Sequence, residues 1–188
     1  VMVSSRDNAD RFTAPVLVSD PAASVTSHGE NAPCLVRGAR GMTALWEQES
    51  PDGTGSQLMA AHSAMGTKWS KPVVVTDKAA PSGNGFQNLC VAPSGDVYAV
   101  WLDGRERDAG NGSCVYLARS TDGGKTWQKN VRVAKNVCPC CRPAVAATED
   151  GAVHVVWRHV FPGDIRDLAS LTSRDGGETF PETPVRVA

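Results

Sequence analysis

Short apolar segments separated by turn residues run along the whole chain. In the clearest stretch, β-branched and aromatic residues fill the segments 87–92, 97–102, 114–119 and 131–134, and PSGD and TDGG stand among the sequences between them. Segments of this length, bounded by Gly, Pro, Asp and Ser, are typical of β-strands. No window carries apolar residues at the sustained spacing of an amphipathic helix. The sequence therefore predicts an all-β chain.

One turn sequence recurs along the chain. STDGGKTW from residue 120 and SRDGGETF from residue 173 both match S-x-D-x-G-x-x-[WF], and two degenerate copies, SRDNADRF and SAMGTKW, begin at residues 5 and 63. The segments ALW, AVW and VVW repeat at a similar interval and end at Trp46, Trp101 and Trp157. Since each period also holds four strand segments, it is the length and content of one blade of a β-propeller.

This period divides the chain into predicted blades. Residues 1–188 form a single propeller segment, in which 1–20 supply the outer strands of a first blade and 28–78, 85–135 and 140–188 are complete blades. The total is about three and a half four-stranded blades, whereas propellers close with roughly four to eight. Two interpretations follow: the chain is a fragment of a longer protein, or two copies associate as a homodimer that completes the ring.

The turn motif itself predicts a structural role. Its aspartate can accept hydrogen bonds from the N–H groups of the turn, its glycine supplies a positive φ, and its aromatic ring packs the turn onto the blade. We therefore expect these turns to stabilise the fold and not to bind metal.

Strand alternation places the long loops at one end of the propeller. The turn motifs and the short PSGD and TEDG turns fall at the other end, so ligand-binding chemistry is expected on the loop-rich face. The loops there are Ser27–Pro33, Trp101–Asp108, Asn136–Pro143 and Trp157–Asp167. They carry His28, Glu30, Asp103, Arg105, Cys138, Cys140, Cys141, Arg142, Arg158, His159, Arg166 and Asp167.

Arginines are prominent in this set. Because a guanidinium group binds carboxylate with two parallel hydrogen bonds, their convergence indicates an anionic or polyhydroxylated ligand. The alternative is that they form ion pairs with Asp103, Asp164 and Asp167 that tie the loops together. The predicted ligand-binding residues are Arg105, Arg142, Arg158, Arg166, His28 and Glu30.

Six cysteines are many for 188 residues, and three of them stand in the tetrapeptide CPCC. Cys138, Cys140 and Cys141 have three interpretations. They could be thiolate ligands for zinc or copper, with His28, His154 or His159 completing the shell; Cys138 could form a structural disulfide with Cys114; or they could be free or redox-active thiols. The remaining two cysteines, Cys34 and Cys90, are expected to be buried thiols. A disulfide or a thiolate metal site would favour an exported protein.

Charge and hydropathy exclude other classes of partner. The 19 basic and 20 acidic residues form no run of like charge, so neither nucleic acid nor an anionic membrane is an expected partner. No stretch reaches the roughly 18 consecutive apolar residues of a membrane span.

The repeated S-x-D-x-G-x-x-[WF] turns resemble the Asp boxes of sialidases and of BNR-repeat proteins over the whole chain. The resemblance implies a sialidase-like β-propeller and, for an active sialidase, an arginine triad, a tyrosine nucleophile with a glutamate, and an aspartate acid. Arg142, with Arg105 or Arg166, matches a triad arginine, and Asp103 and Asp167 are the candidate acids. The only tyrosines, Tyr98 and Tyr116, stand inside strands and are expected to face the core.

Two functional hypotheses remain open. The first is a non-catalytic propeller that binds a glycan or a protein on the loop-rich face. The alternative is an exo-sialidase-type glycoside hydrolase whose catalytic set is completed by further blades or a second chain. The segments NVCPCCRPAV and GDIRD are similar to those of exported bacterial sialidase-like proteins, so the resemblance implies a periplasmic or secreted protein.

Overall fold

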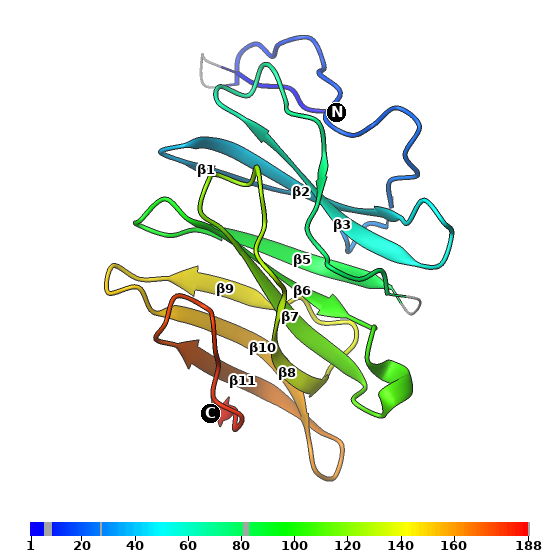
Figure 1. Cartoon of the computed structure of the whole chain (residues 1–188), viewed down its shortest axis with the longest axis vertical. Helices are drawn as coiled ribbons and strands as arrows, with labels where there is room; N and C mark the ends of the chain where they lie inside the picture. Colours follow the sequence, from blue (N-terminus) through cyan, green and yellow to red (C-terminus); the bar gives the residue numbers. More distant parts are fainter. Residues whose placement is uncertain (6–8, 27, 81–82, 188) are drawn as a thin grey trace.

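The computed structural model describes residues 1–5, 9–26, 28–80 and 83–187. Within this part the chain consists of β-strands and one short 3-10 helix, and Figure 1 shows the strands as successive twisted layers running from the N-terminal to the C-terminal end. No helix in these ranges is long and apolar enough to cross a membrane. The elements are β1 Cys34–Gly38, β2 Gly41–Glu49, β3 Ser56–Ser63, β4 Val73–Val74, β5 Asn84–Val91, β6 Val97–Asp103, η1 Arg107–Ala109, β7 Ser113–Ser120, β8 Val131–Val137, β9 Ala144–Ala147, β10 Val153–Phe161, β11 Ile165–Ser173 and β12 Val185–Arg186.

The strands pair antiparallel in sequence order, as four-stranded blades require. Strands β1 to β4 form one sheet, β5 to β8 pair consecutively, and β9 to β12 do the same. A single pair, Val137 opposite His159, joins the last two groups. In the N-terminal segment, Met2 and Val16 exchange backbone hydrogen bonds of 2.8 Å. The fold is the all-β, sialidase-like propeller arrangement that the repeat predicted.

The hydrophobic core lies between neighbouring sheets. Alternating residues of β2, β3, β6 and β7 form one cluster around Leu45 and Trp101, and residues of β6, β7, β10 and β11 form the next around Val100 and Trp157. Trp101 is 0% exposed and Trp157 is 1% exposed. The repeated tryptophans are therefore the largest side chains of the core, and burying each contributes about 3 kcal/mol or more.

The turn motif has the predicted structure in both complete copies. The carboxylate of Asp122 accepts hydrogen bonds from the backbone N–H of Lys125 (3.0 Å) and Thr126 (2.9 Å) and from the hydroxyl of Ser120 (2.8 Å). Partial burial acts to raise the pKa of Asp122, but these bonds and the Thr126 hydroxyl outweigh it and lower the pKa to about 2. Asp175 has the same set of bonds in the last copy.

Each complete turn also docks on the sheet before it. The carbonyl of Gly123 accepts a hydrogen bond from the hydroxyl of Thr43 (2.8 Å) and lies 2.7 Å from Nδ1 of His62. In the last copy, the carbonyl of Gly176 accepts a hydrogen bond from the hydroxyl of Tyr98 (3.1 Å). The turn motif therefore joins neighbouring sheets. In the first, degenerate copy, residues 6–8 lie outside the described ranges, and so does Ser27 at the start of the first predicted loop.

Candidate functional site

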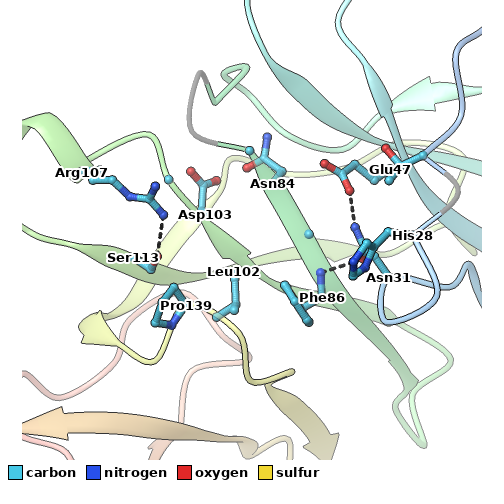
Figure 2. Close-up of a pocket in the computed structure, with 14 residues that line it drawn as sticks. His28, Asn31, Glu47, Asn84, Phe86, Leu102, Asp103, Arg107, Ser113 and Pro139 are labelled. Atoms are coloured by element: carbon cyan, nitrogen blue, oxygen red, sulfur yellow. Dashed lines mark hydrogen bonds between the residues drawn. The ribbon is translucent and has the colours of Figure 1, made fainter.

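The loop-rich end of the sheets contains a pocket of about 410 Å³. It lies where β2 and β6 end and where the chain enters β1 and β5, so the strands position its walls. Figure 2 shows its polar side chains facing one another from these segments. It is lined by Thr26, His28, Asn31, Glu47, Gly83, Asn84, Gly85, Phe86, Leu102, Asp103, Gly104, Arg107, Ser113 and Pro139.

Glu47 provides a buried carboxyl group to one wall of this pocket. The side chain lies near the end of β2, and its Oε2 accepts a hydrogen bond from the side-chain amide of Asn31. Desolvation raises the pKa of Glu47, although hydrogen bonds from Ser56, Thr26 and Asn31 partly oppose this. The surroundings of Glu47 therefore shift its equilibrium toward the protonated form.

Asn84 lines the same pocket and carries a buried side-chain oxygen without a partner among the described residues. Its amide nitrogen donates to the carbonyl of Ser56 (2.6 Å) and its backbone N–H donates to the Ser56 hydroxyl (2.7 Å), so the side chain is fixed. Asn84 is 2% exposed, and its Oδ1 has no hydrogen-bond partner in the described part of the chain. In the view of Figure 2 it lies between Asp103 and Glu47. A buried acceptor without a partner costs about 1–3 kcal/mol.

Phe86 adds an aromatic side chain held in a strained conformation. Its φ is 54°, in the left-handed region that a bulky residue rarely occupies. The strain occurs at the irregularity between Gly85 and Asn88 in the pairing of β5 with β6, and Asn31 Oδ1 accepts the backbone N–H of Phe86 (2.8 Å). Strained residues of this kind cluster at functional sites.

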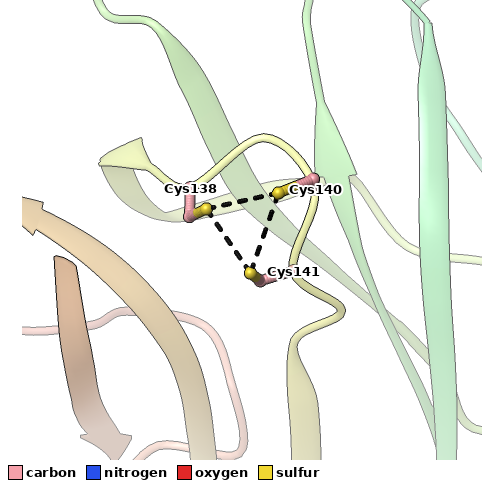
Figure 3. A group of neighbouring side chains, drawn as sticks. All are labelled: Cys138, Cys140 and Cys141. Atoms are coloured by element: carbon pink, nitrogen blue, oxygen red, sulfur yellow. Dashed lines mark hydrogen bonds between the residues drawn. The ribbon is translucent and has the colours of Figure 1, made fainter.

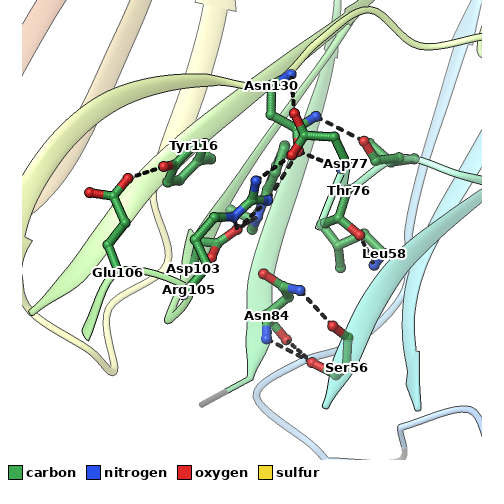
Figure 4. Close-up of polar contacts among 12 residues, drawn as sticks. Ser56, Leu58, Thr76, Asp77, Asn84, Asp103, Arg105, Glu106, Tyr116 and Asn130 are labelled. Carbon is green, nitrogen blue, oxygen red and sulfur yellow. Dashed lines mark hydrogen bonds and ion pairs between the residues drawn. The ribbon is translucent and has the colours of Figure 1, made fainter. Parts of the chain in front are cut away.

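Asp103, one of the two predicted acids, lies in the pocket wall and is fully paired. Its carboxylate accepts hydrogen bonds from the indole N–H of Trp101 (2.8 Å) and from the backbone N–H (2.8 Å) and Nε (2.9 Å) of Arg105. Figure 4 shows the guanidinium group of Arg105 between Asp103 and Asp77, and Asn130 accepts a further bond of 3.0 Å. The Arg105 side chain is 8% exposed, so this predicted ligand-binding arginine joins two sheets.

The other predicted arginines lie outside this pocket. Arg142 donates to the carbonyls of Gln87 and Glu30, both at 2.6 Å, and thereby connects the segments before β9 and β1 with strand β5. Arg158 and Arg166 both approach the cysteine loop, and Arg166 also pairs with Asp164 at 3.3 Å. The second predicted acid, Asp167, is bound by Arg186 at 2.7 Å.

Of the sequence-predicted residues, therefore, His28 and Asp103 line the pocket. Sequence reasoning missed Asn31, Glu47, Asn84, Phe86 and Arg107. Asn31 and Arg107 lie inside the predicted loops Ser27–Pro33 and Trp101–Asp108, and Glu47 directly follows the repeated tryptophan, so these positions provided signals that could have found them.

The three cysteines of CPCC come together in one loop. Their Sγ atoms are separated by 3.6 Å between Cys138 and Cys140, 3.9 Å between Cys140 and Cys141, and 3.4 Å between Cys138 and Cys141 (Figure 3). Burial acts to raise the pKa of Cys138, but the backbone N–H of Cys140, the two other thiols and Arg166 lower it to about 7.

All six cysteines are free thiols, so the predicted disulfide between Cys114 and Cys138 is not formed. The reason is the register of β7 and β8. Irregularities in their pairing place Val137 opposite Ser113 and leave Cys138 beyond the last pair. The Cys138 thiol consequently faces its own loop, while Cys114 is 0% exposed in the core between the sheets.

Both tyrosines are buried, as expected. The hydroxyl of Tyr116 donates to the carboxylate of Glu106, and the Arg105 guanidinium lies 4.3 Å from the centre of the Tyr116 ring. Desolvation and Glu106 raise the pKa of Tyr116, so this phenol is protonated at neutral pH. Neither tyrosine lines the pocket.

Solved structures share this fold at low sequence identity. An α-L-arabinofuranosidase from Fusarium graminearum, bound to an iminosugar inhibitor, matches 98% of the chain with 17% identity and a TM-score of 0.63. A Penicillium chrysogenum α-L-arabinanase bound to arabinobiose matches 98% with 15% identity and a TM-score of 0.59. The Hadza microbial sialidase Hz136 matches 79% with 20% identity and a TM-score of 0.54. The chain is thus a sialidase-like propeller of the type on which glycoside hydrolases are built.

The family follows from the sequence model that fits the chain. The BNR repeat-like domain matches residues 1–187, and the protein belongs to this family. No curated protein matches the chain. The chain spans 57% of the length of the arabinofuranosidase and of the arabinanase, and 36% of the length of the sialidase.

Proposed function

We propose that the pocket at the loop-rich end binds a carbohydrate. The observation that carries this proposal is the combination of aromatic Phe86 with the polar residues Asn31, Glu47, Asn84 and Arg107 in the lining of one cavity. An aromatic ring packs against the apolar C–H face of a sugar, and fixed polar groups select its hydroxyls. The cavity volume of about 410 Å³ is sufficient for one or two sugar rings.

The lining favours a neutral sugar over an acidic one. Two carboxyl groups, Glu47 and Asp103, line the pocket, and Arg107 is its only lysine or arginine among the described residues. The predicted arginines that a carboxylate ligand would need contact protein groups elsewhere. The arabinobiose bound by the arabinanase is a neutral sugar. Arabinobiose is therefore the first probe, and sialyllactose is the acidic comparison.

Isothermal titration of the 188-residue chain with arabinobiose and sialyllactose tests this proposal. We expect saturable binding that is tighter for arabinobiose. Phe86→Asn should weaken it tenfold or more, because asparagine tolerates the left-handed backbone and lacks the aromatic ring. Arg107→Ala should weaken it less, and Lys135→Ala, on the exposed side of β8, should leave it unchanged. Equal affinities of Phe86→Asn and the unmodified chain would contradict the proposal.

Hydrolysis of the bound sugar is a second candidate function, favoured by the two carboxyl groups of the pocket. Glycoside cleavage uses a pair of carboxyl groups with different proton affinities, one as the acid and one ionised. Glu47 is buried with a raised pKa, whereas the Asp103 carboxylate is paired with Arg105. Glu47 would protonate the leaving oxygen, and Asp103, held by Trp101 and Arg105, would be the second carboxyl group.

Turnover separates the two candidates. We expect release of methylumbelliferone from its arabinofuranoside, and loss of this activity in Glu47→Gln. Binding of arabinobiose without any turnover would leave the carbohydrate-binding proposal standing and remove the hydrolytic one. Both functions suit a periplasmic or secreted protein, because polymeric glycans lie outside the cytoplasm, and recovery of the chain only in the cytosolic fraction of its cell would contradict export.

A further inference from the structure

The CPCC loop presents three thiols to one central point. The Sγ atoms of Cys138, Cys140 and Cys141 lie within 4.8 Å of one another, with separations from 3.4 to 3.9 Å. Metal–thiolate bonds of about 2.3 Å place two sulfurs about 3.8 Å apart in tetrahedral and about 4.0 Å apart in trigonal coordination. The sulfurs need to move by only a few tenths of an ångström to surround an ion.

The backbone on both sides of this loop is fixed. The N–H of Cys138 donates to the carbonyl of Arg158 (2.8 Å), directly after the pairing of Val137 with His159. Beyond the loop, Ala144 begins strand β9 and pairs with Val156 of β10. Since both anchors are on β10, the positions of the three thiols are set by the sheet.

The surroundings favour a monovalent, soft ion in three-coordination. Among the described residues, no histidine, carboxylate or fourth cysteine joins the group of three. Structural zinc is almost always four-coordinate, whereas thiolates also select Cu(I). Three thiolates and Cu(I) leave a charge of −2, and the guanidinium groups of Arg166 and Arg158 lie 3.9 Å from Cys138 Sγ and 3.8 Å from Cys141 Sγ. Two arginines therefore match the charge of a Cu(I) site better than that of a Zn(II) site.

We propose that Cys138, Cys140 and Cys141 bind one Cu(I) ion through three thiolates. The ion would also fix Pro139, which stands between two of its ligands and lines the carbohydrate pocket. The site stands on its own geometry and does not depend on what the pocket binds.

Competition with a chromophoric chelator tests the site. The chain, reduced and kept free of oxygen, is titrated into the Cu(I) complex of bicinchoninate, and a parallel titration uses Zn(II) and a zinc chelator. We expect the chain to remove one Cu(I) per molecule from bicinchoninate. At comparable chelator concentrations, Zn(II) should stay bound to the zinc chelator. Each of Cys138→Ser, Cys140→Ser and Cys141→Ser should weaken Cu(I) binding at least tenfold, and Cys90→Ser, a thiol outside the group, should not.

Three results would overturn the proposal. The first is unchanged Cu(I) binding in all three serine variants, whose folding is checked by circular dichroism. The second is tighter retention of Zn(II) than of Cu(I). The third is a disulfide between Cys138 and Cys141 in protein whose thiols were alkylated at cell lysis, seen as a two-hydrogen mass deficit in the peptide that contains CPCC. X-ray absorption of the copper-loaded chain should show three sulfur neighbours at about 2.3 Å.

Discussion

Replacing Gly124 by alanine should destabilise the protein far more than the same change at Gly151. The φ angles are +84° and +81°, so both variants bear the cost of a Cβ in the left-handed region, about 1–2 kcal/mol. A Cβ on Gly151 would have no atom within 4 Å. A Cβ on Gly124 would lie 2.4 Å from Cγ2 and 2.7 Å from Oγ1 of Thr43, on strand β2 of the preceding sheet. The difference between the variants therefore measures the docking of the turn motif.

The size of this difference follows from the contact. Overpacking of a fixed contact costs about 1–3 kcal/mol. Moving Thr43 also weakens its hydrogen bond to the carbonyl of Gly123, which contributes about 1 kcal/mol. We expect Gly124→Ala to lose about 3–6 kcal/mol and Gly151→Ala about 1–2 kcal/mol. Gly177→Ala should fall between them, because its Cβ would lie 3.2 Å from side-chain atoms of Leu117 and Tyr98.

Urea unfolding followed by tryptophan fluorescence measures these losses in stability. In thermal unfolding, each 1 kcal/mol lost should lower Tm by about 2–4 °C in a chain of this size. Thr43→Ala supplies the internal control, since it removes both atoms nearest to the new Cβ. In that background Gly124→Ala should cost about as much as Gly177→Ala, because the Cβ of residue 43 remains 3.2 Å from the new Cβ. Equal losses at Gly124 and Gly151 in the unmodified chain, or a loss at Gly124 that does not depend on Thr43, would refute the reasoning.

Four further substitutions test the site and its supports. The raised pKa means that the folded protein binds a proton at Glu47 more tightly than the unfolded chain does, so stability falls as pH rises through that pKa. Glu47→Gln should reduce this dependence of stability on pH. Urea unfolding measured from acidic to neutral pH tests it. Arg105→Ala leaves Asp103 buried without its partner and should lower the free energy of unfolding by about 3 kcal/mol. Arg158 is exposed, so Arg158→Ala should change that free energy by no more than about 0.5 kcal/mol. Thermal unfolding measures both. Asp122→Ala removes four hydrogen bonds at the surface and should cost about 1–2 kcal/mol by the same measurement.

The fold could be predicted because its determinants are local. The bonds of Asp122 all lie within four residues, so the spacing S-x-D-x-G-x-x-W specifies the turn wherever it occurs. The predicted strand 97–102 differs from β6 by one residue. The predicted strand 87–92 starts three residues late, because Asn84 pairs with Asp103 across the irregularity at Phe86, which no local pattern indicates.

The pocket could not be predicted because its contacts join distant segments. Asn31 binds Glu47 and also Phe86, 55 residues further along the chain. Arg105 was interpreted as a ligand clamp, yet its partners include Asp77, 28 residues earlier. Only the cysteine group could be assembled from the sequence, because its three members are neighbours in the chain.

The repeated tryptophans explain why this fold is easier to infer than its chemistry. A buried indole N–H needs an acceptor, and in each complete repeat the residue two positions later on the same strand provides it. The acceptors are Gln48 at 3.2 Å, Asp103 at 2.8 Å and His159 at 3.3 Å. The scaffold thus requires an acceptor at this position but accepts an amide, a carboxylate or an imidazole. Because these positions lie at the loop-rich end of the second strand of each sheet, the same structural requirement places a different reactive group there in each repeat.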